Sequence, residues 1–196
     1  MSYPALPGAA ASNHDARMLP DTFQTERLVL RPIAADDAGP IFETYAQDPV
    51  VTRFLTWRPH ASRPETDTYI ARCLATPPDV ARTYVLTGRD HPAPFGAFDL
   101  RRTAAHRLDF GYVLGRAWWG QGLMTEALRT VVAWAFAQPD VFRIGSFCDV
   151  ENAGSARVME KAGLTREGVF RRWLVHPNVS AEPRDCFVYA RVREAA

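Results

Sequence analysis

The chain has 196 residues, and its 23 lysine and arginine residues nearly balance its 22 aspartate and glutamate residues, giving a formal net charge of +1. This balance argues against a nucleic-acid partner or a membrane partner, since both usually need a concentrated basic surface. The length suits a single domain, and an apolar fraction of 47% supports a sizeable core. The longest apolar run, Val131–Ala137, is far shorter than the roughly 20 residues that cross a bilayer.

The cysteines and the N-terminus point to the reducing cytoplasm as the expected compartment. Cys73, Cys148 and Cys186 are odd in number and widely separated, and none has a companion in metal-ligand spacing. We therefore expect neither a disulfide framework nor a metal site. Residues 1–21 lack the cationic start and apolar core of a signal peptide, so we expect a flexible N-terminal tail followed by one domain over 22–196.

Hydrophobic periodicity predicts the elements of that domain. In chain order they are a strand at 26–31, helices over 35–47 and from 62 to 76, strands at 83–88, 95–101 and 107–114, a long helix over 122–137, a strand at 142–150, a helix over 153–162, and strands at 167–175 and 184–192. The short loops between residues 83 and 114 favour an antiparallel meander. The strand–helix–strand crossover from Leu108 to Val150 implies a parallel pair. The predicted fold class is α+β: a single mixed, mostly antiparallel sheet of about seven strands flanked by about four helices.

The most informative stretch runs from Gly111 to Ala127, where a strand enters a loop containing Gly120 and Gly122 and the longest helix begins. Glycine lets the backbone turn so that its N–H groups converge, and a helix N-terminus adds unpaired donors and a partial positive charge. Together these features predict an anion site suited to a phosphate or diphosphate. Taken alone, the two glycines fit equally well a strand-to-helix turn that needs glycine only for packing.

Two familiar nucleotide motifs are excluded. A P-loop requires Lys-Ser or Lys-Thr after the second glycine, where Leu123 and Met124 stand here. A dinucleotide fold requires a third glycine three residues further on, where this chain has Thr125, and an acidic residue about 20 positions later. The region 141–144 contains no acidic residue, so the predicted anion site does not follow either scheme.

Four segments in the expected order resemble the GCN5-related N-acetyltransferase (GNAT) family, and within it the ribosomal-protein alanine N-acetyltransferase branch. They are Thr25–Pro32, Trp119–Ala127, Asp149–Leu164 and Arg184–Ala190. One departure is Ala117, where the family motif carries glutamine or arginine. The resemblance covers roughly residues 22–192 and implies the GNAT fold, with acetyl-CoA as co-substrate and no metal.

The resemblance also implies where acetyl-CoA binds. The pantetheine arm would enter between two splayed strands and bond the strand backbone, the loop would hold the diphosphate, and the start of the following helix would flank the thioester. The implied residues are Val113, Leu114, Trp119, Gly120, Gln121, Gly122, Leu123, Met124, Thr125, Asn152 and Ser155. On residue chemistry alone, Asn152 is equally a helix N-cap and Ser155 a first-turn hydroxyl.

The implied reaction is direct attack of a primary amine on the acetyl thioester. A protonated amine is not a nucleophile, so a base has to remove its proton, and a donor has to assist the departing thiolate. The resemblance implies Asp109 as the candidate base, because it lies on the strand next to Gly111, where relatives often carry glutamate. Strand alternation turns it away from Phe110 and to the same face as Gly111. An exposed strand carboxylate without a role is the equal alternative. Ser155 is the candidate hydrogen-bond donor to the thiolate.

The sequence leaves the acceptor and the assembly open. The acceptor is an amine of a protein N-terminus or of a small molecule, docked near 52–70 and 175–183. The alternative function is a non-catalytic acyl-CoA sensor or scaffold module, and a homodimer is compatible with the sequence. The histidines have no partner pattern, and His60, His91, His106 and His176 are all expected at the surface.

Overall fold

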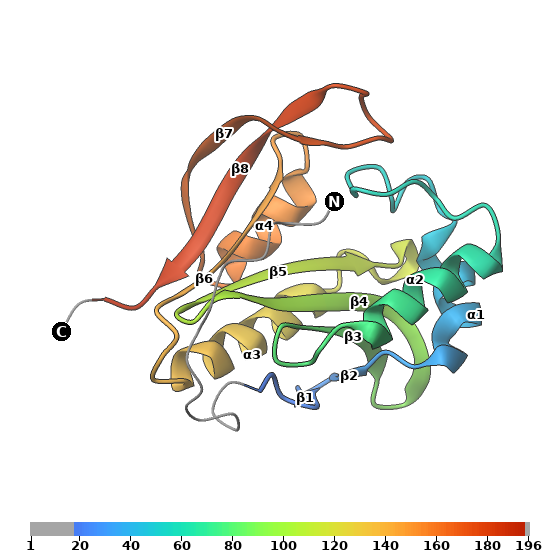
Figure 1. Cartoon of the computed structure of the whole chain (residues 1–196), viewed down its shortest axis with the longest axis horizontal. Helices are drawn as coiled ribbons and strands as arrows, with labels where there is room; N and C mark the ends of the chain where they lie inside the picture. The colour runs from blue at the N-terminus through green and yellow to red at the C-terminus, as the bar shows by residue number, and fades with distance from the viewer. Residues whose placement is uncertain (1–17, 195–196) are drawn as a thin grey trace.

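The computed structural model describes residues 18–194, which contain a mixed sheet in the order β1-β2-β3-β4-β5-β6-β8-β7 (Figure 1). The strands are β1 (Phe23–Gln24), β2 (Leu28–Pro32), β3 (Ala81–Gly88), β4 (His91–Ala104), β5 (Arg107–Leu114), β6 (Arg143–Asp149), β7 (Thr165–Val175) and β8 (Pro183–Val192). All neighbours are antiparallel except β5 and β6. The predicted mixed, mostly antiparallel sheet is confirmed, with one strand more than expected because Phe23–Gln24 pairs with β2.

The helices are α1 (Ala38–Ile41), α2 (Arg63–Ala75), α3 (Leu123–Ala137) and α4 (Ala153–Lys161). The region 35–47 is not the single helix that was expected: α1 lies between a 3₁₀ turn, Ala35–Asp37, and a π-helical turn, Phe42–Ala46. Gly39 and Pro40 lie within α1 and weaken the helical pattern of this region, since glycine favours helix weakly and proline has no amide to donate.

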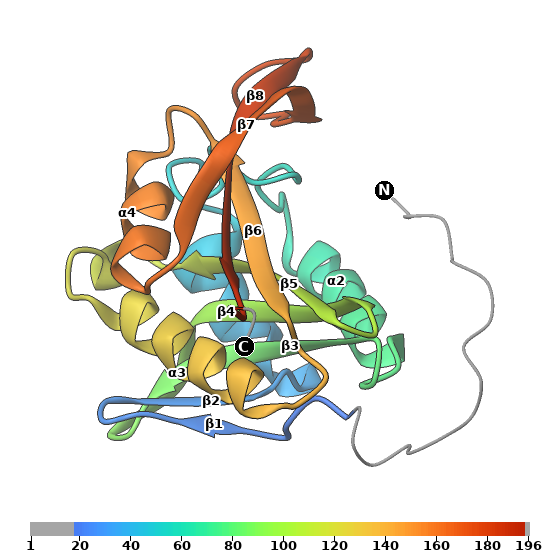
Figure 2. The same ribbon diagram turned by 90° about the vertical axis from the view of Figure 1, so that its left-hand side faces the viewer.

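Two apolar cores lie on opposite faces of the sheet, as Figure 2 shows by the positions of α3 and α2. The larger core packs α3 and α4 against β2–β6, and the smaller one packs α1 and α2 against β3 and β4. Two adjacent apolar rows run along α3, and their residues are buried except for Phe136, which is half-buried; the rows are Leu123, Ala127, Val131 and Ala135, and Met124, Leu128, Val132 and Phe136. None of the described helices has both the length and the apolar character needed to span a membrane.

The start of the packed chain lies earlier than expected. Leu19 is only 1% exposed, the Tyr84 hydroxyl donates to the Pro20 carbonyl at 2.6 Å, and Asp21 pairs with Arg82 at 2.6 Å. Leu19, Pro20 and Asp21 therefore contact the sheet, whereas residues 1–17 of the expected tail lie outside the described residues.

The connection between β5 and β6 positions the site. Parallel pairing joins only Arg107–Asp109 to Arg143–Gly145, whereas β6 pairs with β8 along its whole length, from Arg143 to Asp149. The two central strands therefore separate over their C-terminal halves, and β6, β7 and β8 lean away from β5 (Figure 1).

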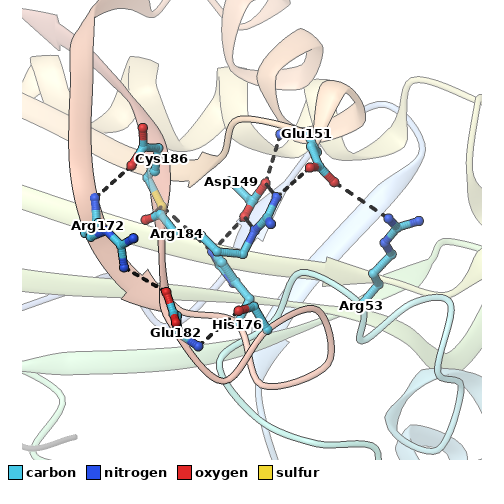
Figure 3. Close-up of polar contacts among 10 residues, drawn as sticks. Arg53, Asp149, Glu151, Arg172, His176, Glu182, Arg184 and Cys186 are labelled. Carbon is cyan, nitrogen blue, oxygen red and sulfur yellow. Dashed lines mark hydrogen bonds and ion pairs between the residues drawn. The ribbon is translucent and has the colours of Figure 1, made fainter.

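A buried ion network holds the β7–β8 hairpin to the end of β6 (Figure 3). The fully buried Asp149 accepts hydrogen bonds from Arg184 at 2.6 and 3.2 Å and from the Glu151 amide at 2.9 Å. Arg184 also reaches Glu151, and His176 Nε2 lies 3.7 Å from Asp149. His176 is only 3% exposed, so its expected place at the surface is wrong; packing of the hairpin buries it.

We expect Asp149→Asn to lower the free energy of unfolding by about 2 kcal/mol at pH 7, because it removes the buried carboxylate charge that accepts hydrogen bonds from Arg184 and from the Glu151 amide. Burial raises the pKa of Asp149, but the bonds from Arg184 and from the Glu151 amide outweigh it and hold that pKa below its usual value. The carboxylate thus stabilises the fold above the pKa of an unfolded aspartate, and this stabilisation is lost as pH falls through the lowered native pKa.

Urea unfolding across pH measures this effect, with the difference between wild type and Asp149→Asn shrinking in acid. Glu151→Gln is the matched control, because its side chain is 53% exposed, and we expect a change within about 1 kcal/mol. An equal loss of unfolding free energy in the two variants would contradict the claim that Asp149 stabilises the fold more than Glu151 does.

Candidate active site

The separation of β5 from β6 opens a cavity of about 340 Å³. Its walls include Phe110–Val113 of β5 and Ser146–Cys148 of β6, with Asn152 and Ser155 from the start of α4. Its other side is formed by residues between 41 and 69 and by Leu174 and His176 of the hairpin region. The two strands, the start of α4 and both predicted acceptor regions thus meet around one space.

The edge of β5 presents backbone groups to this gap. The Gly115 amide donates to the Phe95 carbonyl of β4 at 2.8 Å, and backbone direction alternates along a strand. The backbone of Val113 therefore faces β4, whereas the groups of Tyr112 and Leu114 face the gap. The Leu114 carbonyl accepts a hydrogen bond from the indole N–H of Trp119 at 2.7 Å. The Leu114 amide and the amide and carbonyl of Tyr112 therefore remain directed toward the gap.

The loop before α3 has the backbone that the two glycines predicted. Gly120 has φ +74° and Gly122, the N-cap of α3, has φ +76°, a region that favours glycine. A Cβ added at Gly120 would have no atom within 4 Å, so its surroundings are open. Both glycines are needed for backbone shape, and the space beside Gly120 is free for a ligand.

The first turn of α3 offers amides rather than side chains. The first bond of this turn runs from the Glu126 amide to the Gly122 carbonyl at 3.0 Å, so the amides of Leu123, Met124 and Thr125 precede it and have no acceptor in the helix. Their side chains are 5%, 4% and 8% exposed and anchor the turn in the core. Converging amides with a helix-dipole end are suited to an anion.

Ser155 and Asn152 lie at the other end of the gap. Asn152 Oδ1 accepts the Ser155 amide at 3.1 Å, so the N-cap interpretation of Asn152 is confirmed. Ser155 Oγ lies 2.8 Å from the hydroxyl of Tyr112, a contact that the sequence did not predict. Burial raises the pKa of Tyr112 well above its usual value, so the phenol stays protonated and can donate.

Two carboxylates lie on the α2 face of the sheet. Leu108 and Phe110 are buried on the other face, which agrees with the alternation predicted for Asp109. Asp109 lies 3.8 Å from Arg107, on the part of β5 that still pairs with β6, and does not line the cavity. The carboxylate that does line it is Asp99 of β4, which accepts a hydrogen bond from Thr83 at 3.0 Å and pairs with Arg101.

The two predicted acceptor regions are tied to each other. Asn178, in the loop between β7 and β8, donates to the carbonyls of Thr52 and Trp57, both at 2.8 Å. Arg53 of the same segment lies 3.7 Å from Glu151 (Figure 3). These contacts join the segment 52–57, part of which lines the cavity, to the β7–β8 loop and to the start of α4. No sequence pattern predicts this role of Asn178, because a single asparagine in a loop belongs to no recognisable motif.

Comparison with known proteins supplies the family. Residues 27–165 match the model of the acetyltransferase (GNAT) domain. The chain is 43% identical over 75 residues to the probable N-acetyltransferase YjcK of Bacillus subtilis, a stretch covering 38% of this chain and 41% of that relative.

Two solved structures share the fold. RimL, a ribosomal L7/L12 alpha-N-protein acetyltransferase in complex with coenzyme A, is 20% identical with a TM-score of 0.75, covering 89% of this chain and 97% of its own. The microcin C7 self-immunity acetyltransferase MccE, in complex with acetyl-CoA and AMP, is 19% identical with a TM-score of 0.77, covering 91% of this chain and 100% of its own. The family model spans well over half of the chain, which therefore belongs to the GNAT family of N-acetyltransferases.

Proposed function

We propose that the chain transfers an acetyl group from acetyl-CoA to a primary amine. The proposal rests on two neighbouring features. Strand β5 borders the open gap, and the chain after it forms the loop whose amides, from Gly120 to Thr125, are free. A thioester carrier has a diphosphate and an amide-rich arm, which are the groups these two features can bind. Members of the fold hold coenzyme A or acetyl-CoA, which supports the assignment.

The residues present fit such a ligand. The amides of 120–125 would hold the diphosphate, with Trp119 and Gln121 shaping the loop through bonds to Leu114 and Ala117. The pantetheine arm would bond Tyr112 and the Leu114 amide, because these face the gap, and the side chain of Val113 would line its wall. Asn152 would act through the turn that it caps.

In the proposed reaction the amine nitrogen forms a bond to the acetyl carbon, the carbon–sulfur bond breaks, and the amine proton passes to a base. Ser155 would donate a hydrogen bond to the departing thiolate, and Tyr112 would supply the hydrogen bond behind Ser155. Since the phenol of Tyr112 keeps its proton, this pair can stabilise negative charge without itself becoming charged.

Asp109 and Asp99 compete for the role of base. Asp109 is on the predicted face of β5, but Asp99 is the one that lines the cavity, opposite Gly111 in the strand register. A base has to come within hydrogen-bond reach of the amine, directly or through one water. Position in the cavity therefore favours Asp99 over Asp109.

We propose that the acceptor is the amine of a protein N-terminus or of a small molecule. RimL, whose name describes an acetyltransferase of the first kind, shares the fold. A non-catalytic acyl-CoA sensor is the alternative, and a homodimer stays a prediction. Catalysis is favoured over sensing because a carboxylate and a hydroxyl pair line the same cavity as the gap.

Gly120→Glu should weaken coenzyme A binding by about 100-fold or more, since it fills the open space beside the amides and adds a like charge. Gly120→Ala is the matched control, because it adds only the left-handed backbone strain of about 1 kcal/mol, or roughly fivefold in Kd. Isothermal titration with coenzyme A measures both. Unchanged affinity in Gly120→Glu would remove the loop from the diphosphate site.

Asp99→Asn should lower the rate of transfer about 100-fold at neutral pH, and the loss should shrink as rising pH deprotonates the amine without help. Asp109→Asn, the matched control on the neighbouring strand, should leave the rate–pH profile unchanged. Coenzyme A affinity should be the same in both variants. The reverse pattern, with Asp109→Asn impaired and Asp99→Asn normal, would assign the base to Asp109.

An acceptor screen tests the activity itself. Purified protein with acetyl-CoA should release free thiol when the correct amine is added, and mass spectrometry should show that amine heavier by one acetyl group. The screen compares N-terminal peptides, polyamines, amino acids and aminoglycosides. Tight coenzyme A binding with no thiol release across all four classes would favour the sensor alternative.

A further inference from the structure

Arg27 lies in the turn between β1 and β2 and reaches the loop that precedes α3. Its Nη1 donates to the Gln121 carbonyl at 3.0 Å, while its Nε and Nη2 lie 2.7 and 2.6 Å from Glu126 Oε2. Its backbone amide donates to the other carboxylate oxygen at 3.0 Å, beside the hydroxyl of Thr25. One side chain thus holds the backbone before Gly122 and the first turn of the helix after it.

The bond to the Gln121 carbonyl fixes the direction of the next amide. In a planar trans peptide the carbonyl and the following N–H point to opposite sides. With the Gln121 carbonyl held toward Arg27, the Gly122 amide is turned away from the β1–β2 turn. Gly122 is at φ +76°, so without this bond glycine allows the peptide to rotate through several orientations.

The bond from Arg27 to Glu126 neutralises a negative charge that would repel an anion bound at this loop. Glu126 lies in the first turn of α3, where a carboxylate interacts favourably with the same helix end that would bind a diphosphate. Burial raises the pKa of Glu126, but hydrogen bonds from Thr25 and Arg27 outweigh it, so the net shift is downward and the group stays ionised. The two-point contact with Arg27 turns this charge toward a cation and neutralises it.

We infer that Arg27 is a positioning residue for coenzyme A: it orients the Gly122 amide and neutralises Glu126, so that the loop accepts a diphosphate. The inference rests on the proposed function, since it concerns the same loop. It assigns a role in ligand binding to a residue of the β1–β2 turn that does not itself have to touch the ligand.

Arg27→Met tests the inference by isothermal titration with coenzyme A. We expect the Kd to rise about tenfold, since both the amide orientation and the charge balance are lost. Inhibition of acetyl transfer by pantetheine, which lacks the diphosphate, should be unchanged. Arg31→Met is the matched control, because it removes an arginine of β2 that pairs with Asp37 at 2.7 Å. It should leave the Kd for coenzyme A unchanged.

A double variant separates the two effects. Arg27→Met combined with Glu126→Gln removes the unpaired carboxylate and should recover part of the lost affinity, whereas Glu126→Gln alone should change the Kd less than Arg27→Met does. If Arg27→Met unfolds too readily to titrate, Arg27→Lys replaces it. A lysine keeps the charge but cannot hold the carbonyl and both contacts to Glu126, so about threefold weaker binding is expected.

Three results overturn the inference: an unchanged Kd for coenzyme A in the Arg27 variant, an equal loss of pantetheine inhibition, or the same loss in Arg31→Met. These outcomes are distinct from failure of the proposed function. In that case wild-type protein itself would show no coenzyme A binding in the first titration.

Discussion

The brevity of the parallel contact between β5 and β6 is the constraint on which the site depends. Only three residues of each strand pair with each other; beyond them each strand is paired on its other edge alone, β6 with β8 and β5 with β4. A longer parallel contact would close the gap and pair the backbone of Tyr112 and Leu114 with β6. Two carbonyls at this edge of β5 are bonded by side chains. Ser146 Oγ donates to the Phe110 carbonyl at 2.7 Å, and the indole N–H of Trp119 donates to the Leu114 carbonyl.

The two cores divide the support of the site between them. On the α3 face, buried side chains at Leu123, Met124 and Thr125 anchor the first helical turn, so its amides are presented without side chains in front of them. On the α2 face, residues between 41 and 69 line the cavity on the side where we propose that the acceptor docks. The β7–β8 hairpin completes the enclosure: Asp149 binds Arg184 at the start of β8, and Asn178 of the connecting loop binds the Thr52 carbonyl.

Local pattern was sufficient wherever a single segment decides the outcome. The apolar rows of α3, the positive φ of Gly120 and Gly122, the cap at Asn152 and the face of Asp109 all follow from periodicity or residue type within one element. The extra strand β1 was missed because two residues carry no periodic signal.

Features that depend on contacts between distant segments could not be predicted. Which carboxylate lines the cavity depends on where β5 leaves β6, so alternation placed Asp109 on the right face but could not show that Asp99 lines the cavity instead. The contact of Tyr112 with Ser155, the burial of His176 and the bond from Arg27 to Gln121 likewise join segments far apart in the chain.

A crystal structure of the protein grown with coenzyme A tests the central claim most directly. The account predicts the diphosphate against the amides of residues 120–125 and the pantetheine arm between β5 and β6, bonded to Tyr112 and Leu114. Electron density for the diphosphate at another surface, or a gap filled by the protein's own side chains with the ligand elsewhere, would contradict it.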